Sequence, residues 1–252
     1  MRRFFYDPVI QDKDEEVLIV GPEAHHIRNV LRMQVGDNAE LFDARGTVVS
    51  GEITRISSKE VVFQVLSRQD ASKAGVPLTL AQAVLKGKKM DLLVQKATEL
   101  GVHIFVPVIS RYCESPGKIG QQLERWQRIM LEACKQCHRP IPLQICAPVA
   151  LKELPLPEEG HKIMPWENEA GTHFSALDLG NGQPVLVLIG PEGGFHPAEV
   201  AYAKEAGFTT VSLGPRILRA ETAALAVVVL IQQGMGNFSL TGYPHTSRNP
   251  NM

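Results

Sequence analysis

The second half of the chain alternates short apolar runs with segments of helical spacing. The apolar runs predict buried strands at Leu78–Leu85, His103–Ser110, Val185–Ile189 and Thr209–Leu213. The amphipathic or apolar segments between and after them predict helices at Lys88–Glu99, Leu123–His138, Ala198–Ala206 and Glu221–Gln233. Strands that alternate with helices in this way are typical of a parallel α/β sheet.

The pattern is different before residue 70, where short β-rich runs are joined by polar turns. They predict strands at Asn38–Phe42, Val48–Ile56 and Glu60–Leu66, with one short helix from about Pro22 to Met33. The small polar residues of Gln69–Gly75 indicate a linker. We therefore expect a β domain over residues 1–72, an α/β domain over 73–240 and a disordered tail over 241–252.

Two glycine-rich turns follow two of the predicted strands. The first is Gly190-Pro-Glu-Gly-Gly194, and the second begins at Gly214-Pro215 and continues through charged residues. Glycine tolerates positive φ and has no Cβ, so its backbone can approach a ligand closely. Neither turn matches the dinucleotide or P-loop pattern. A single turn of this kind commonly only reverses the chain, whereas two matched turns predict the two walls of one ligand site.

Composition and charge narrow the choice of partners. The net charge of the 252-residue chain is −1, so any contact with nucleic acid requires a local patch. From Val84 to Pro140 ten Lys and Arg residues stand against five Asp and Glu, a local excess of five positive charges. This run is either an ordinary solvated pair of helix faces or a face that binds phosphates.

The four cysteines include one Cys-x-x-Cys pair, Cys134 and Cys137. A zinc site would need a second pair or histidines at metal spacing, so we interpret the pair as a helix face and expect no metal. No signal peptide and no apolar run of membrane-spanning length is apparent, which predicts a cytoplasmic protein that does not enter a membrane.

The two glycine turns resemble the signature loops of the RsmE family, at Ile189–Phe195 and Leu213–Ala223. Members of this family are SPOUT-class methyltransferases that methylate N3 of one uridine in 16S ribosomal RNA and use S-adenosylmethionine. The resemblance extends over roughly residues 2–235 and includes Arg2–Phe5, His25–Arg32, Lys86–Asp91, Gln95–Gly101 and Glu132–Cys137. It weakens around Arg111–Gly117 and Cys137–Pro140.

The resemblance implies a PUA-like β-barrel followed by a SPOUT α/β knot, a trefoil-knotted parallel sheet with flanking helices. It also implies a homodimer, for which the apolar helix Ala223–Ile231 offers a surface. The cofactor positions that it indicates are Gly190, Pro191, Glu192, Gly193, Gly194, Leu213, Gly214 and Leu218, with a third wall near Met164–Trp166. The residues expected to contact RNA are Arg2, Arg3, Arg28, Arg32, Lys86, Lys89 and Arg139.

The chemistry of methylation at N3 points to three charged residues of the second turn. Uracil N3 must lose its proton, and the charge that develops spreads onto two carbonyl oxygens. Arg216 and Arg219 suit that charge because a guanidinium stays ionised. Glu221 could accept the proton, orient an arginine, or be only a carboxylate favoured at a helix start. Glu192 is a second candidate for the proton.

Two other functions are compatible with the same motifs. One is a non-catalytic RNA-binding or ribosome-assembly protein, although the intact Gly-Pro-Glu-Gly-Gly and Arg-x-x-Arg-x-Glu motifs argue against it. The other is a SPOUT methyltransferase that acts on another RNA, such as transfer RNA. The sequence alone fixes neither the nucleotide position nor the proton acceptor.

Overall fold

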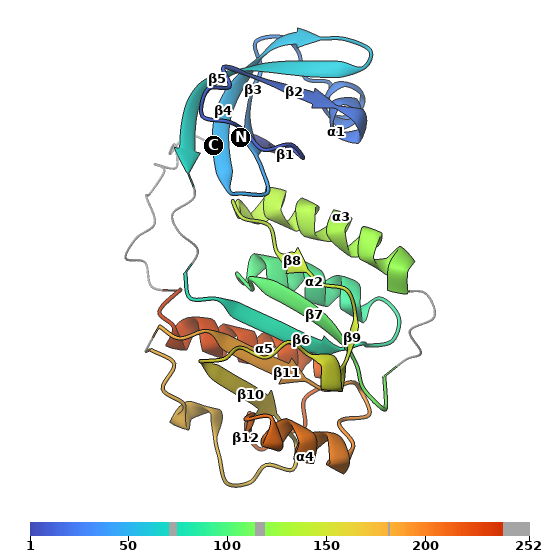
Figure 1. Ribbon diagram of the computed structural model, residues 1–252. Helices are drawn as coiled ribbons and strands as arrows, with labels where there is room; N and C mark the ends of the chain where they lie inside the picture. Colours follow the sequence, from blue (N-terminus) through green and yellow to red (C-terminus); the bar gives the residue numbers. More distant parts are fainter. Residues whose placement is uncertain (71–74, 114–118, 181, 239–252) are drawn as a thin grey trace.

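The computed structural model describes residues 1–70, 75–113, 119–180 and 182–238. The chain forms two bodies that lie end to end, each built on its own sheet (Figure 1). The predicted boundary at residue 72 and the predicted tail lie outside the described residues. We refer to residues 2–70 as the N-terminal part and to residues 78–238 as the C-terminal part.

The N-terminal part is a five-stranded sheet with the order β1-β3-β4-β5-β2. Its strands are β1 (Arg2–Phe5), β2 (Glu16–Val20), β3 (Asn38–Phe42), β4 (Thr47–Ile56) and β5 (Glu60–Asp70). Alternate side chains of β2 are buried, as expected for a strand with one face on a core. The predicted helix is shorter than expected: α1 (Gly21–His25) passes directly into one π-helical segment, η1 (His26–Val30).

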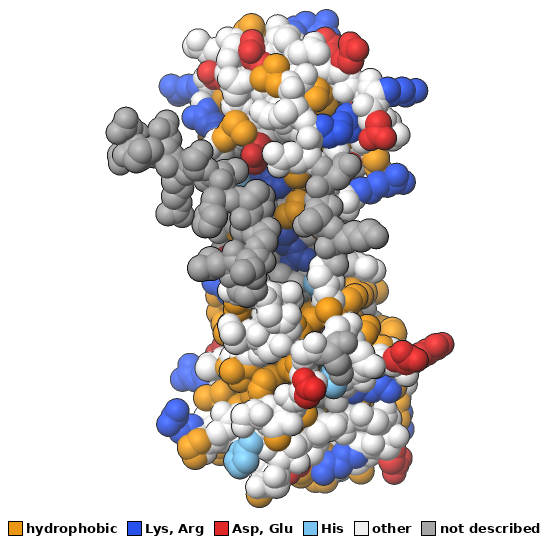
Figure 2. Space-filling model, turned by 90° about the vertical axis from the view of Figure 1, so that its left-hand side faces the viewer, with side chains coloured by type: hydrophobic (Ala, Val, Ile, Leu, Met, Phe, Trp, Pro, Cys, Tyr) orange, Lys and Arg blue, Asp and Glu red, His pale blue; other side chains and the backbone are white. Residues whose placement is uncertain are grey.

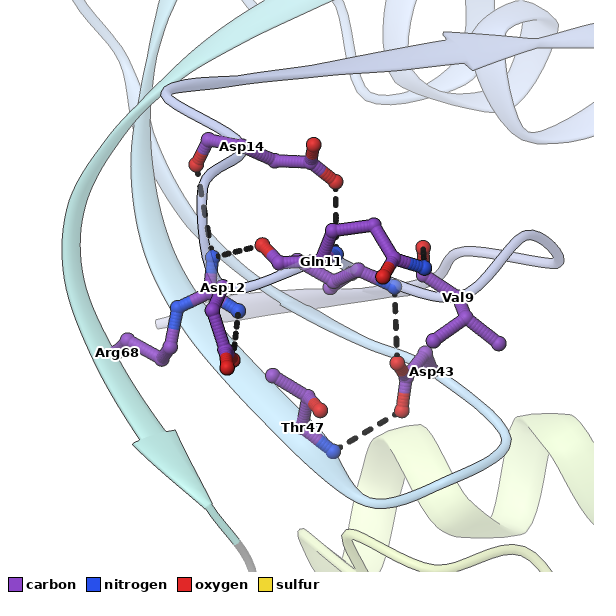
Figure 3. Close-up of polar contacts among 8 residues, drawn as sticks. Val9, Gln11, Asp12, Asp14, Asp43, Thr47 and Arg68 are labelled. Atoms are coloured by element: carbon purple, nitrogen blue, oxygen red, sulfur yellow. Dashed lines mark hydrogen bonds and ion pairs between the residues drawn. The ribbon is translucent and has the colours of Figure 1, made fainter.

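A buried carboxylate fixes the chain that connects β1 and β2. Asp43 lies at the end of β3, and its side chain is fully buried. Its carboxylate accepts hydrogen bonds from the backbone N–H groups of Ile10 and Thr47, at 3.0 and 2.9 Å (Figure 3). A third hydrogen bond comes from the backbone N–H of Arg45, at 2.9 Å. Three donors compensate the loss of water around the charge, so one side chain holds both a tight turn and a distant segment.

Arg68 on β5 supports the same connection from the other side. Its guanidinium donates to the carbonyl oxygen of Gln11 at 2.6 Å and lies 3.8 Å from the carboxylate of Asp12 (Figure 3). The Asp12 side chain is fully exposed, so this second contact should add little.

The C-terminal part is a seven-stranded sheet in which every pair is parallel. The order is β12-β10-β11-β6-β7-β8, with β9 also paired to β7. The strands are β6 (Leu78–Ala83), β7 (Ile104–Ile109), β8 (Gln144–Ile145), β9 (Val149–Ala150), β10 (His161–Pro165), β11 (Val185–Ile189) and β12 (Thr209–Val211). The parallel α/β sheet predicted from the alternating pattern is therefore confirmed.

Helices cover both faces of this sheet, which explains why β11 is buried along its whole length. On one face α2 (Lys89–Glu99), α3 (Ile119–Cys137) and α5 (Ala220–Gly234) enclose a core that includes Trp126, Phe105 and Val187. On the other face α4 (Pro197–Glu205) and the 3₁₀ turn η2 (Leu151–Glu153) enclose a second core. A further 3₁₀ turn, η3 (Phe174–Ala176), precedes β11.

Helix α3 joins the two parts (Figure 1). The guanidinium of Arg3 is buried, lies 4.4 Å from the centre of the Phe42 ring and donates to the carbonyl oxygen of Cys134 at 3.3 Å. The next residue, Lys135, forms an ion pair with Glu23 of α1. These contacts attach the N-terminal sheet to the last turns of a helix that belongs to the C-terminal core.

Replacement of Asp43 should destabilise the N-terminal part. In Asp43→Ala three backbone N–H groups lose their acceptor, and we expect the free energy of unfolding to fall by about 3 kcal/mol. Urea denaturation followed by circular dichroism measures the change. Asp12→Ala is the matched control, because it removes an exposed carboxylate from the same region. Equal stability of the two variants would contradict this role for Asp43.

Candidate functional site

The candidate site lies where the parallel strands of the C-terminal part end. Because these strands run in one direction, the loops that follow β6, β10, β11 and β12 all leave the same edge of the sheet (Figure 1). In open α/β sheets, ligands bind outside the carboxyl ends of the strands. The two glycine turns of the sequence are the loops after β11 and β12, so both lie on this edge.

The loop after β11 needs its glycines for space and for backbone conformation. Gly194 has φ +70°, and a Cβ at this position would lie 2.8 Å from a carboxylate oxygen of Glu167. A Cβ on Gly193 would lie 3.1 Å from the Cβ of Tyr112. Both neighbours come from other loops of the same edge, so this loop sits in a narrow space between them.

A buried glutamine, which sequence reasoning missed, anchors the start of this loop. Gln82 on β6 donates from its amide nitrogen to the carbonyl oxygen of Gly190 at 3.2 Å. The side chain is fully buried, and its own oxygen lacks a hydrogen-bond partner among the described residues. An amide side chain inside the otherwise mostly apolar run Leu78–Leu85 was the signal that could have indicated it.

The loop after β12 is more open. Gly214 has φ +117°, and its N–H donates to the hydroxyl oxygen of Ser212 at 3.2 Å. Leu213 and Leu218 are half-buried, whereas Arg216 is exposed. Arg219 is also exposed and is the N-cap residue of α5, so it stands between the loop and the helix.

Four charged side chains from three segments meet at this edge. The ammonium of Lys89 lies 2.9 Å from Oε1 of Glu192 and 3.7 Å from Oε2 of Glu221. The backbone N–H of Lys86 also donates to Oε1 of Glu192, at 3.1 Å. Arg219 is near enough to Lys89 for the two positive charges to repel each other. The structure thus brings Arg219, Glu192 and Glu221 together, and it adds Lys89, which we expected on an RNA-binding surface.

The pKa values of the paired groups shift in opposite directions. The hydrogen bond to Glu192 raises the pKa of Lys89 above its ordinary value. Partial burial by itself would raise the pKa of Glu192, but its hydrogen bonds from Lys89 and from backbone N–H groups lower it overall. Both groups are therefore charged at neutral pH.

The turn after β10 lies beside the loop after β11, near the position where the resemblance predicts a third wall. Its backbone is fixed by a hydrogen bond from the N–H of Trp166 to the carbonyl oxygen of Val211, at 3.0 Å. Glu169 accepts hydrogen bonds from the hydroxyl of Thr210 and from two backbone N–H groups, which lower its pKa. Glu167 lies between these two hydrogen-bonded residues, and its carboxylate is beside Gly194.

Two arginines that we expected to contact RNA have internal roles. Arg3 is buried at the junction with α3, as described above. The guanidinium of Arg139 donates to the carbonyl oxygens of Ile141 and Thr98, at 2.6 and 2.9 Å. The buried guanidinium of Arg3 is not accessible to a phosphate, so that expectation does not fit the structure. Arg139 is half-buried, and its contact with RNA stays a prediction.

The other basic residues of the N-terminal part are more accessible. Arg2 and Arg32 are exposed, although Arg2 also donates to the carbonyl oxygen of Leu31 at 3.2 Å. Arg28 is half-buried beside an open cleft of about 400 Å³. The residues that line this cleft are Gly21, Ala24, His25, Arg28, Ser58 and Lys59. In the C-terminal part Lys86 is exposed at the carboxyl edge of the sheet.

The cysteines are free thiols, and Cys134 lies inside the helix packing as expected for a helix face. Burial raises the pKa of the Cys134 thiol to about 11. In the part of the chain that the structure describes, no three His, Cys, Asp or Glu side chains are grouped to hold a metal ion. Nor is any described helix long and apolar enough to cross a membrane.

Comparison with known families places this architecture in one class. A family model described as "RNA methyltransferase domain" matches residues 72–232, and one described as "RNA methyltransferase PUA domain" matches residues 19–66. A parallel sheet with glycine-rich loops at its carboxyl edge, preceded by a PUA domain, is thus the SPOUT-type RNA methyltransferase architecture implied by the resemblance.

Individual relatives identify the branch of that class. The Ribosomal RNA small subunit methyltransferase E of Buchnera aphidicola subsp. Schizaphis graminum is 32% identical over 85% of this chain and 89% of its own. That of Bacillus subtilis is 31% identical over 89% and 93%. The crystal structure of the Neisseria gonorrhoeae enzyme, bound to S-adenosyl methionine, has 30% identity and a TM-score of 0.84, and covers 92% of this chain and 97% of its own. The chain belongs to the ribosomal RNA small subunit methyltransferase E family.

Proposed function

We propose that this protein transfers the methyl group of S-adenosylmethionine to N3 of a uridine in 16S ribosomal RNA. The observation that carries the proposal is the meeting of two glycine-rich loops and a charged cluster at the carboxyl edge of one parallel sheet. The gonococcal relative holds S-adenosyl methionine, and the curated relatives bear the name of a small-subunit ribosomal RNA methyltransferase. Ribosomal RNA is made in the cytoplasm, so we propose that the protein works there.

The two loops fit the shape that this cofactor requires. Backbone groups of Gly190–Gly194 and of Leu213–Leu218 would line it, because the glycines leave the backbone uncovered. Pro191 is buried and sets the course of the first loop. The cofactor supplies a methyl group on a sulfonium, which is already activated for transfer. The protein therefore has to bind, orient and exclude water rather than form a covalent intermediate.

The second loop would stabilise the negative charge that develops on the reacting base. Arg219 stands at the N-terminus of α5 with its guanidinium exposed, and Arg216 lies three residues earlier in the loop. Both would stabilise negative charge on the uracil oxygens as N3 loses its proton. Glu221, two residues after Arg219, is half-buried and would orient Arg219 or accept the proton.

RNA would contact the protein at two separated surfaces. Lys86 is exposed at the edge of the methyltransferase site. The cleft lined by Arg28, His25 and Lys59 would hold a phosphate-sugar segment, and Arg2 and Arg32 are exposed in the same part. Contacts to phosphate position an RNA without reading its bases, so this cleft would contribute affinity rather than the choice of nucleotide.

A second copy of the chain would bind to the exposed apolar side chains of α5 and α2. On α5 the side chains of Val229 and Leu230 are 39% and 44% exposed, and Leu92 on the neighbouring α2 is 40% exposed. Figure 2 shows that hydrophobic side chains also reach the surface of the C-terminal part on the face drawn there. Exposed large apolar side chains on adjacent helices suit a self-association surface, and we propose a homodimer.

Methyl transfer to small-subunit RNA is the direct test of the function. Unmethylated 30S particles incubated with the protein and labelled S-adenosylmethionine should gain one N3-methyluridine, located by mass spectrometry of 16S RNA fragments. Arg219→Ala should lower the single-turnover rate on the order of 10²-fold, because it removes a charge that meets the developing anion. Its affinity for RNA should change much less. Label in transfer RNA alone would favour another substrate, and no transfer to any RNA would favour a non-catalytic role.

Replacement of Gly194 should weaken cofactor binding. Gly194→Val places a branched side chain at φ +70° and against the carboxylate of Glu167, so the loop must move. Calorimetry should show affinity for S-adenosylmethionine reduced by about 10-fold or more. Gly36→Ala is the control, because Gly36 also has positive φ, but an added Cβ there meets nothing within 4 Å. Unchanged affinity in Gly194→Val would remove this loop from the cofactor site.

The dimer depends on the exposed face of α5. Leu230→Glu should convert the protein to a monomer, because a charge cannot be buried in an apolar contact without a partner. Light scattering at micromolar concentration measures the mass. Leu18→Glu on β2 is the matched control, since Leu18 is 42% exposed on the other part of the molecule. A wild-type protein that is monomeric and fully active would contradict the proposal.

A further inference from the structure

Lys89 occupies an unusual place between the two loops of the candidate site. Glu192 belongs to the loop after β11, and Glu221 lies in the first turn of α5, directly after the second loop. Lys89 comes from neither, since it is the first residue of α2. Its ammonium contacts both carboxylates, at 2.9 and 3.7 Å. Among the ion pairs of the described residues, no other connects these two segments.

The charges at this point argue against contact with RNA. Lys89 carries one positive charge, and its two partners together carry two negative charges. Arg219 adds a second positive charge close enough to repel that of Lys89, so this group of four charges is neutral overall. A phosphate that approached the ammonium would have to displace Glu192 and would then stand near two carboxylates. An exposed lysine without acidic neighbours serves that purpose better.

The partial exposure of the three side chains limits how much the ion pairs can stabilise the fold. The side chains of Lys89, Glu192 and Glu221 are 37%, 28% and 16% exposed. Ion pairs in contact with water contribute little to global stability. Their effect on position can be larger, because transfer between two bound groups is sensitive to displacements of about 1 Å. A residue of this kind can therefore matter for the reaction and hardly at all for the fold.

We infer that Lys89 is a positioning residue: its ammonium holds Glu192 and Glu221 together and so fixes the spacing of the two loops across the site. This inference rests on the proposed function for its reaction step. It replaces the role that the sequence suggested for Lys89, contact with RNA phosphate. The buried oxygen of Glu221, which has no hydrogen-bond partner among the described residues, has the ammonium as its nearest ion-pair partner.

The test compares Lys89→Met, which keeps the aliphatic stem, with Lys89→Arg, which keeps the charge. Lys89→Met should weaken binding of S-adenosylmethionine roughly 10-fold and lower the single-turnover rate at saturating RNA by at least as much, within the range known for coupled charge networks. Lys89→Arg should restore most of both losses. RNA affinity across a salt series should change little in either variant.

Lys96→Met is the matched control. Lys96 lies on the same helix and has a side chain that is 36% exposed. Among the described residues its ion-pair partner is Glu99 of that helix. It should bind the cofactor and react as the wild type does. Thermal melting of all variants should coincide within about 2 °C, because exposed ion pairs contribute little to the fold.

A double-mutant cycle with Glu192→Gln decides whether Lys89 acts through its partner. Once Glu192 is neutral, the further change Lys89→Met should weaken cofactor binding less than 3-fold, because coupled residues are not additive. Cofactor affinity equal to that of the wild type in Lys89→Met, with a salt slope for RNA lowered by about one contact, would return Lys89 to the RNA surface. Fully additive losses would also overturn the inference.

The cycle is measured by calorimetry with the cofactor alone, so its result does not depend on methylation of RNA. A protein that binds S-adenosylmethionine but methylates no RNA would refute the proposed function, and the cycle would still show whether Lys89 acts through Glu192.

Discussion

The direction of the strands in the C-terminal sheet is the constraint on which the rest of the molecule depends. All of its pairs are parallel, so paired strands are joined by long connections rather than hairpins, and the carboxyl ends of the strands emerge at one edge. The connecting helices bury both faces of the sheet, so a ligand can reach the sheet at the loops of its carboxyl edge. Residues 82, 89, 167, 192 and 219 are far apart in the chain and become neighbours for this reason alone.

Much of the fold was predictable because the spacing of apolar residues along the chain indicates which side chains are buried. The alternating runs indicated β6, β7, β11 and the four helices of the C-terminal part to within a few residues. Strand β10 escaped because it is short and begins with His161 and Lys162, so it lacks a continuous apolar run. The switch to a π-helical turn at His26–Val30 has no periodic signal at all. A knot likewise has no periodic signature, and only the resemblance suggested one.

The candidate site was predictable in its loops and much less so in its charges. Glycine motifs are local and can be recognised directly in the sequence. An ion pair between residues 103 positions apart instead depends on the tertiary fold. The basic run from Val84 to Pro140 illustrates the difference. Four of its nine described cations form ion pairs: Lys89 with Glu192, Arg125 with Asp91 at 2.6 Å, Lys96 with Glu99, and Lys135 with Glu23. A local excess of positive charge in the sequence therefore overstated the charge available to a nucleic acid.

The attachment of α3 to the N-terminal sheet has a geometric consequence for the substrate. Arg3 and Lys135 hold the basic cleft of one part and the carboxyl edge of the other in a single arrangement. An RNA can occupy both only if its own fold presents a backbone segment and a target base at the matching separation. If an RNA binds both surfaces as proposed, the shape of the folded RNA would be part of what the protein recognises, beside the identity of the base.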